Sequence, residues 1–176
     1  MKKACSLIFI SMILFSCAPV LRVDLMQQGS FDVNFSDLED DPGFYKGKLY
    51  ILGGVIAKTT ATKRGSLIEA LYIPVDSRGY LKELSPSGGR FLALYPERFL
   101  EPLIFRERRE ITLAGEFVEM RRGYIDEIEY SFPLFDIKEL YLWEVRRDYY
   151  YVEPYPYWYY PYPYWWYDPW WRYRYY

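Results

Sequence analysis

The sequence contains no histidine, and only two of its 176 residues are cysteines, Cys5 and Cys17. Without histidine the chain lacks the side chain that most often acts as a general base, binds a metal ion or activates a nucleophilic serine or cysteine. It also lacks a calcium-binding loop of the Asp-x-Asp-x-Asp-Gly type, and no pair of carboxylates stands out by its spacing. We therefore expect a protein that is not an enzyme and that holds no metal ion or other cofactor.

Strong charge and long apolar segments are absent as well. The 22 basic and 24 acidic residues give a net charge of −2, a balance without the basic footprint of a nucleic-acid-binding protein. The apolar run at the N-terminus, residues 4–15, is too short to cross a bilayer as a helix. We expect no nucleic-acid partner, and the length favours one domain with extensions.

The N-terminus carries the pattern of a bacterial lipoprotein signal peptide. A basic start and the apolar run lead to Leu14, Phe15, Ser16 and Cys17, so a small residue precedes the cysteine and a leucine lies three positions before it. This lipobox pattern predicts cleavage after residue 16 and fatty acyl chains, such as palmitate, on Cys17. Several acyl chains together hold a protein firmly to a membrane. Ala18 stands where an aspartate would signal inner-membrane retention, so we expect attachment to outer-membrane lipid.

Other interpretations of this segment are an uncleaved anchor, an ordinary secreted protein, or a disulfide between Cys5 and Cys17. Cys5 lies inside the apolar run of the signal peptide, which argues against the disulfide. On the lipoprotein interpretation the mature chain has no free thiol. It keeps 20 basic and 24 acidic residues, for a net charge of −4.

Beyond the signal peptide, residues 1–16, the sequence divides into three parts. Residues 17–41 show no clear hydrophobic period and predict the lipidated N-terminus and a tether, with one short docked segment around residues 31–35. Residues 42–147 predict a folded β domain, and residues 148–176 form a tail rich in tyrosine, tryptophan and proline.

The pattern within the β domain predicts six short strands separated by turns that contain glycine or proline. They are residues 49–58, 67–75, 90–95, 110–118, 124–132 and 134–143. Gly53 and Gly54 lie inside the first strand and indicate a bend, a bulge or a close backbone approach, as suits a sheet that coils sharply to close on itself. Lys138 with Glu139 breaks the alternation of the last strand as a bulge would. Short strands with little helix favour an antiparallel barrel or a sandwich. About a hundred residues and the removal of exposed edges favour a small closed barrel.

A series of short motifs, in chain order, resembles the Slp (starvation-inducible) family of outer-membrane lipoproteins. The motifs include Pro42, Gly43, Tyr45, Gly47 and Lys48, then Gly53, Gly54, Val55 and Ile56, then Pro74, Val75 and Asp76, then Gly89, Arg90, Phe91 and Leu92, then Phe99, Leu100 and Pro102, then Ile111, Thr112, Leu113 and Gly115, then Tyr130, Phe132 and Pro133, and finally Leu142 and Trp143. With the lipobox they cover most of the chain except the tail. The resemblance implies a mainly β, OB-like barrel, an outer-membrane location and stress- or starvation-linked expression. It carries over no catalytic residue, and only Cys17 transfers, as the lipid attachment point.

Two carboxylates of the β domain have competing interpretations. Glu69 lies in an otherwise apolar strand and is either a ligand contact at the barrel mouth or the partner of a nearby arginine. We favour the pair, because buried charges are normally paired. Asp76 lies in a turn, where an Asx-type cap is a better interpretation than a catalytic role.

Five arginines flank the fourth expected strand, and they are Arg106, Arg108, Arg109, Arg121 and Arg122. If the fold brings them together, they form a basic patch for anionic lipid or phosphate-bearing glycans. The alternative is that they face solvent and are balanced by neighbouring glutamates.

The tail contains five prolines, which exclude a regular helix or a central strand and favour an extended, polyproline-like chain. The first interpretation of the tail is that its indole rings lie at a membrane–water interface, and the second is that they contact an envelope glycan or a protein partner. The third interpretation is a low-complexity extension. The tryptophans concerned are Trp158, Trp165, Trp166, Trp170 and Trp171.

Together these features predict a lipid-anchored outer-membrane lipoprotein, on the periplasmic face, with a structural or binding role in the bacterial envelope. The alternative is a module that binds an oligosaccharide or small ligand on an OB-type barrel.

Overall fold

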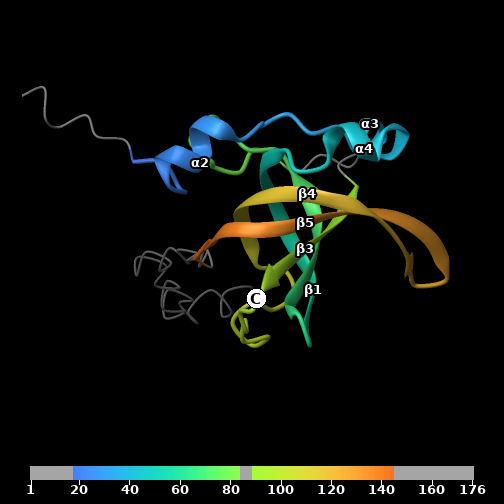
Figure 1. Cartoon of the computed structure of the whole chain (residues 1–176). Helices are drawn as coiled ribbons and strands as arrows, with labels where there is room; N and C mark the ends of the chain where they lie inside the picture. The colour runs from blue at the N-terminus through green and yellow to red at the C-terminus, as the bar shows by residue number, and fades with distance from the viewer. Residues whose placement is uncertain (1–17, 84–88, 145–176) are drawn as a thin grey trace, which may run out of the picture. The chain divides into compact units, whose positions relative to one another are not determined.

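The computed structural model describes residues 18–83 and 89–144, and its main feature is a closed five-stranded barrel (Figure 1). The strands are β1 Leu49–Thr62, β2 Gly65–Ile73, β3 Arg90–Pro96, β4 Glu110–Ile125 and β5 Ile128–Leu142. Their order around the barrel is β1-β2-β3-β5-β4, in which β3 and β5 are parallel and the other neighbours antiparallel. The prediction of a mainly β protein with a small barrel and little helix is confirmed.

The barrel is filled by aromatic and branched side chains that point inward from every strand. Phe91, Phe117 and Phe135 are almost completely buried, and their rings meet edge to face at centroid distances of 5.6 to 6.0 Å. Gly53 and Gly54 let β1 approach its neighbours closely, because a Cβ at Gly53 would lie 2.6 Å from the carbonyl oxygen of Ile73. The glycine pair therefore has the role that the sequence suggested.

The described residues form five strands where the sequence predicted six. The break predicted between the strands 110–118 and 124–132 is wrong. Strand β4 runs through residues 119–123 to Ile125, and the pairs Arg121–Phe132 and Gly123–Tyr130 continue the ladder. The two predicted strands 124–132 and 134–143 accordingly belong mostly to one strand, β5. The predicted bulge is confirmed, since the register skips Lys138.

Three short helices lie in a row along one side of the barrel (Figure 1). They are α2 Val23–Gln28, α3 Phe35–Asp40 and α4 Pro42–Tyr45. No helix within the described ranges is long and apolar enough to cross a membrane.

Helices α2 and α3 lie where the sequence predicted a tether over residues 17–41 with one short docked segment around residues 31–35. Leu21, Leu25 and Met26 are buried in a small cluster with residues of the barrel wall, among them Ile51. Leu38 of α3 is 1% exposed and belongs to the main core. Helices of six residues or fewer show too little of a 3.6-residue period to be seen in the sequence, which explains the difference.

Candidate functional site

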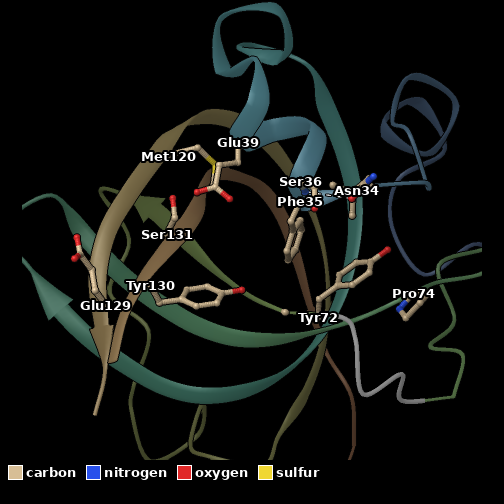
Figure 2. Close-up of a pocket in the computed structure, with 12 residues that line it drawn as sticks. Asn34, Phe35, Ser36, Glu39, Tyr72, Pro74, Met120, Glu129, Tyr130 and Ser131 are labelled. Atoms are coloured by element: carbon tan, nitrogen blue, oxygen red, sulfur yellow. Dashed lines mark hydrogen bonds between the residues drawn. The ribbon is translucent and has the colours of Figure 1, made fainter. Parts of the chain in front are cut away.

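A groove of about 510 Å³ lies between α3 and the β4–β5 hairpin in the described part of the protein (Figure 2). We call it the α3 groove. Three aromatic rings, two carboxylates, several small polar groups and a methionine are among the side chains that line it. These side chains are Phe35, Tyr72, Tyr130, Glu39, Glu129, Asn34, Ser36, Ser131 and Met120. A second hollow shares the hairpin residues and extends the groove toward Pro42 and Arg122.

The rings are held in place by the backbone around them. The Phe35 and Tyr72 rings meet at a centroid distance of 5.2 Å, and the hydroxyl oxygen of Tyr130 accepts a hydrogen bond from the backbone N–H of Arg90 at 3.1 Å. Figure 2 shows Tyr130 pointing across the groove toward Tyr72, whose own hydroxyl points away from Tyr130 on the side of Asn34, with the Phe35 ring above them. The groove therefore offers ring faces together with hydroxyl and carboxylate groups.

The hydroxyl of Tyr72 stays a hydrogen-bond donor at neutral pH. Burial raises the pKa of this phenol above its ordinary value of 10.0, and the charge of Asp32 raises it further. Protonated tyrosine hydroxyls and ionised carboxylates can bind the hydroxyl groups of a ligand, while the rings cover its apolar face.

Glu69 is paired, as we favoured. Its carboxylate lies 2.7 Å from the guanidinium of Arg90 on the neighbouring strand β3, and both side chains are partly buried. Asp76 also has its expected role, because its carboxylate accepts backbone hydrogen bonds from Arg78 and Tyr80 at 2.8 and 2.9 Å.

The five arginines are not brought together. Arg106, Arg108 and Arg109 precede β4, whereas Arg121 and Arg122 lie near its far end, on the order of 40 Å of extended strand away at about 3.3 Å per residue. The structure therefore does not form the single basic patch that the sequence suggested, because β4 does not turn at Arg121.

The individual environments of these arginines also differ. Arg109 is partly buried and donates to the carbonyl oxygens of Ile104 and Trp143, and Arg121 lies 3.2 Å from Glu119. Arg106, Arg108 and Arg122 are exposed. Contact of these three arginines with an anionic surface stays a prediction.

An aromatic cluster lies beside the first described residues of the chain. The Trp143 ring contacts those of Tyr80 and Tyr141 at centroid distances of 5.4 and 4.9 Å. The backbone N–H of Val20 donates to the carbonyl oxygen of Arg78 at 2.9 Å, two residues before Tyr80. No local pattern in the sequence indicates this cluster, because its rings come from two segments about sixty residues apart.

The aromatic cluster is fixed to the barrel by a short chain of hydrogen bonds. The indole N–H of Trp143 donates to the hydroxyl of Thr112 at 3.0 Å, and that hydroxyl donates to the carbonyl oxygen of Gly79 at 2.9 Å. Thr112 is completely buried. The relative positions of the Tyr80 turn and Trp143 are thus set by the barrel itself.

Several predicted site residues lie outside the described residues. These are the lipidation residue Cys17 and the five tail tryptophans, Trp158, Trp165, Trp166, Trp170 and Trp171. Within residues 18–83 and 89–144, no three histidine, cysteine, aspartate or glutamate side chains lie in an arrangement that would hold a metal ion.

Comparisons with known proteins give a consistent result. The family model of the outer membrane lipoprotein Slp family matches residues 14–171. The chain is 25% identical to the outer membrane protein Slp of Escherichia coli (strain K12) over 147 residues, which cover 83% of this chain and 77% of that protein. It is 33% identical to an uncharacterized protein of Haemophilus influenzae over 102 residues, 57% of this chain and 54% of that protein.

One solved structure has a weak likeness to this fold. A crystal structure of a mitochondrial single-stranded DNA binding protein from S. cerevisiae matches with a TM-score of 0.30 and 10% identity, over 56% of this chain and 97% of that one. A likeness of this size supports no inference about fold or function.

Proposed function

Because this chain belongs to the outer membrane lipoprotein Slp family, it is an outer membrane lipoprotein, and we propose that acyl chains on Cys17 hold its barrel at the periplasmic face. We propose a structural or binding role there, without catalysis. From the family resemblance we also propose that starvation or a related stress raises its expression.

The observation that supports a lipid anchor at this end of the barrel is the aromatic cluster beside the start of the described chain. Cys17 immediately precedes Ala18, and Val20 is bonded to the turn that carries Tyr80. Acyl chains on Cys17 would therefore enter the membrane within a few residues of Tyr80, Tyr141 and Trp143. Tyrosine and tryptophan rings are enriched at membrane–water interfaces, since they have an apolar body and a polar tip.

The tail follows Trp143 in the sequence, with residue 145 two positions beyond it. We propose that its tyrosine and tryptophan rings also bind at the interface, and that a glycan or protein of the envelope is the alternative partner. Chains that lack residues 149–176 would then bind phospholipid vesicles and peptidoglycan less strongly than the full chain. Equal binding to both would remove the tail from the proposal.

Protease treatment of intact and permeabilised cells tests the periplasmic orientation. We expect the wild-type protein to be protected in intact cells and digested once the outer membrane is permeabilised. Digestion in intact cells would contradict the periplasmic orientation and would place the barrel on the outer surface.

A second candidate function is the binding of an oligosaccharide in the α3 groove. It is favoured by three aromatic rings that face one groove together with the carboxylates of Glu39 and Glu129. Aromatic faces pack on the apolar faces of sugars, and carboxylates accept hydrogen bonds from their hydroxyl groups.

Titration calorimetry with peptidoglycan fragments tests this second candidate. Glu39→Gln and Glu129→Gln should each weaken binding about tenfold, since each removes a charge-assisted hydrogen bond. Glu127→Gln, in the turn of the same hairpin and outside the groove, is the matched control. The absence of saturable binding by the wild-type chain would contradict this candidate.

A further inference from the structure

The loop between β3 and β4 presents large apolar side chains to solvent. Phe99, Leu103 and Ile104 are 67%, 82% and 52% exposed. Leu103 is the most exposed large hydrophobic residue in the described part of the protein. Three such residues within six positions form an apolar tip of the kind that marks an interaction surface. We call residues 97–109 the apolar loop.

The apolar loop is held firmly by its backbone, so the exposure is built into the fold. The N–H of Leu100 donates to the hydroxyl of Ser66, and the carbonyl oxygen of Phe105 accepts from the hydroxyl of Thr59 at 2.7 Å. Leu100 is buried, and Phe105 packs against the core. The chain thus turns two apolar side chains inward at these anchor points and leaves Leu103 and Ile104 pointing outward between them.

The apolar loop is continuous with the aromatic cluster beside the chain start. The guanidinium of Arg109 donates to the carbonyl oxygens of both Ile104 and Trp143, at 3.3 and 2.6 Å. Trp143 in turn contacts Tyr80. The first described residues, the aromatic cluster and the apolar tip therefore lie along one edge of the barrel.

Other exposed apolar residues lie elsewhere. Tyr124 and Ile128 flank the turn of the β4–β5 hairpin, which extends to the side of the barrel opposite the C-terminal end of β5 (Figure 1). The hairpin end is therefore an internal control for the apolar loop. Its apolar side chains are similarly exposed, but they lie away from the edge that carries the aromatic cluster and the apolar tip.

We propose that the apolar loop inserts Phe99, Leu103 and Ile104 into the bilayer that receives the acyl chains of Cys17. This inference rests on the proposed function, because that function puts the same edge against a phospholipid surface. Arg106 and Arg108 are exposed beside the tip and contact lipid phosphates, as arginines flanking inserted segments do. The barrel is then held at two places, by its acyl chains and by its apolar loop, and its orientation on the membrane is fixed.

A fluorescent label on the loop tests the insertion in the acylated protein. Acylated Cys17 offers no thiol and Cys5 leaves with the signal peptide, so Leu103→Cys provides a single labelling site for an environment-sensitive dye. In vesicles of phosphatidylethanolamine and phosphatidylglycerol we expect a blue shift and quenching by lipid-borne quenchers. The same dye at Tyr124→Cys, which is 71% exposed in the wild type, should remain in water.

The outcomes separate this inference from the proposed function. A Leu103→Cys label that stays in water while the acylated protein is bound to vesicles overturns the insertion and leaves the lipid anchor standing. Failure of the acylated protein to bind vesicles would instead count against the proposed function itself.

Substitutions in the unacylated mature chain, residues 17–176 with Cys17→Ser, give a second measurement. Leu103→Asp with Ile104→Asp should reduce vesicle binding about tenfold or more, whereas Tyr124→Asp with Ile128→Asp should have little effect. Arg106→Glu with Arg108→Glu should weaken binding only when phosphatidylglycerol is present. If the apolar-loop variant loses self-association in sedimentation but keeps its vesicle binding, the tip contacts a second copy of the chain and the proposal is overturned.

Discussion

The guanidinium of Arg109 donates to the carbonyl oxygen of Trp143 at 2.6 Å, which joins the start of β4 to the residue that follows β5. The same group donates to the carbonyl oxygen of Ile104. Arg109 is thus a structural residue that connects the apolar loop to the aromatic cluster. Arg106 and Arg108 lie in the same stretch of four residues but do not have this role.

We expect Arg109→Met to destabilise the mature chain by about 1.5–3 kcal/mol, because both carbonyl oxygens lose a charged hydrogen-bond donor. Urea unfolding of the Cys17→Ser chain measures the change. Arg106→Met is the matched control: its side chain is exposed, and the expected change is within about 0.5 kcal/mol. Equal stability of the two variants would contradict the structural role of Arg109.

The close approach of β1 to its neighbours predicts a large effect for Gly53→Ala. The added Cβ would lie 2.6 Å from the carbonyl oxygen of Ile73, and a paired strand cannot move away without breaking its ladder. We expect a loss of about 2–3 kcal/mol in the free energy of unfolding. At Gly43 in α4 the nearest atom to an added Cβ is 3.6 Å away, so Gly43→Ala should be neutral or slightly stabilising. Similar effects at the two positions, measured by thermal unfolding, would show that the barrel is less tightly closed than described.

Asp76 predicts a pH dependence of stability. Burial acts to raise the pKa of its carboxyl, but the backbone N–H groups of Tyr80 and Arg78 and the charge of Arg78 outweigh it and hold this pKa below the ordinary value of 3.8. A lowered pKa in the folded state means that the ionised carboxylate stabilises the fold above pH 3.8. This contribution is lost as the pH falls through the folded-state pKa.

We therefore expect Asp76→Asn to be less stable than wild type at pH 7, by less than about 1 kcal/mol because the side chain is partly exposed. The difference should shrink as the pH falls from about 4 through the folded-state pKa, where the carboxyl becomes protonated in both the folded and the unfolded state. Unfolding curves of both proteins at several pH values measure it. A difference that stays constant over that range would assign the effect to geometry and not to charge.

Much of the barrel could be predicted from the sequence because its signals are local. Alternation of apolar and polar residues identified most of the strands, and Gly53 marked the close approach of β1 to β2. The skipped residue Lys138 was visible as a break in the alternation. The pair of Glu69 with Arg90 followed from the general rule that a carboxylate within an apolar strand needs a partner.

The parts that could not be predicted depend on contacts between distant segments. Gly123 follows two arginines and looks like a turn, yet its pairing with Tyr130 keeps it in the strand. The α3 groove lies between the extended hairpin and the short helix α3. A sequence prediction that misses either element therefore cannot find the groove. The aromatic cluster needs Tyr80 and Trp143, which only the closed barrel brings into contact.

Acylation of Cys17 is the central claim, and metabolic labelling with palmitate tests it most directly. The wild-type protein should carry the label and fractionate with the outer membrane, because the acyl chains are its anchor. The Cys17→Ser variant should carry none and should be absent from that fraction. An unlabelled wild-type protein, or label that persists in Cys17→Ser, would contradict the account.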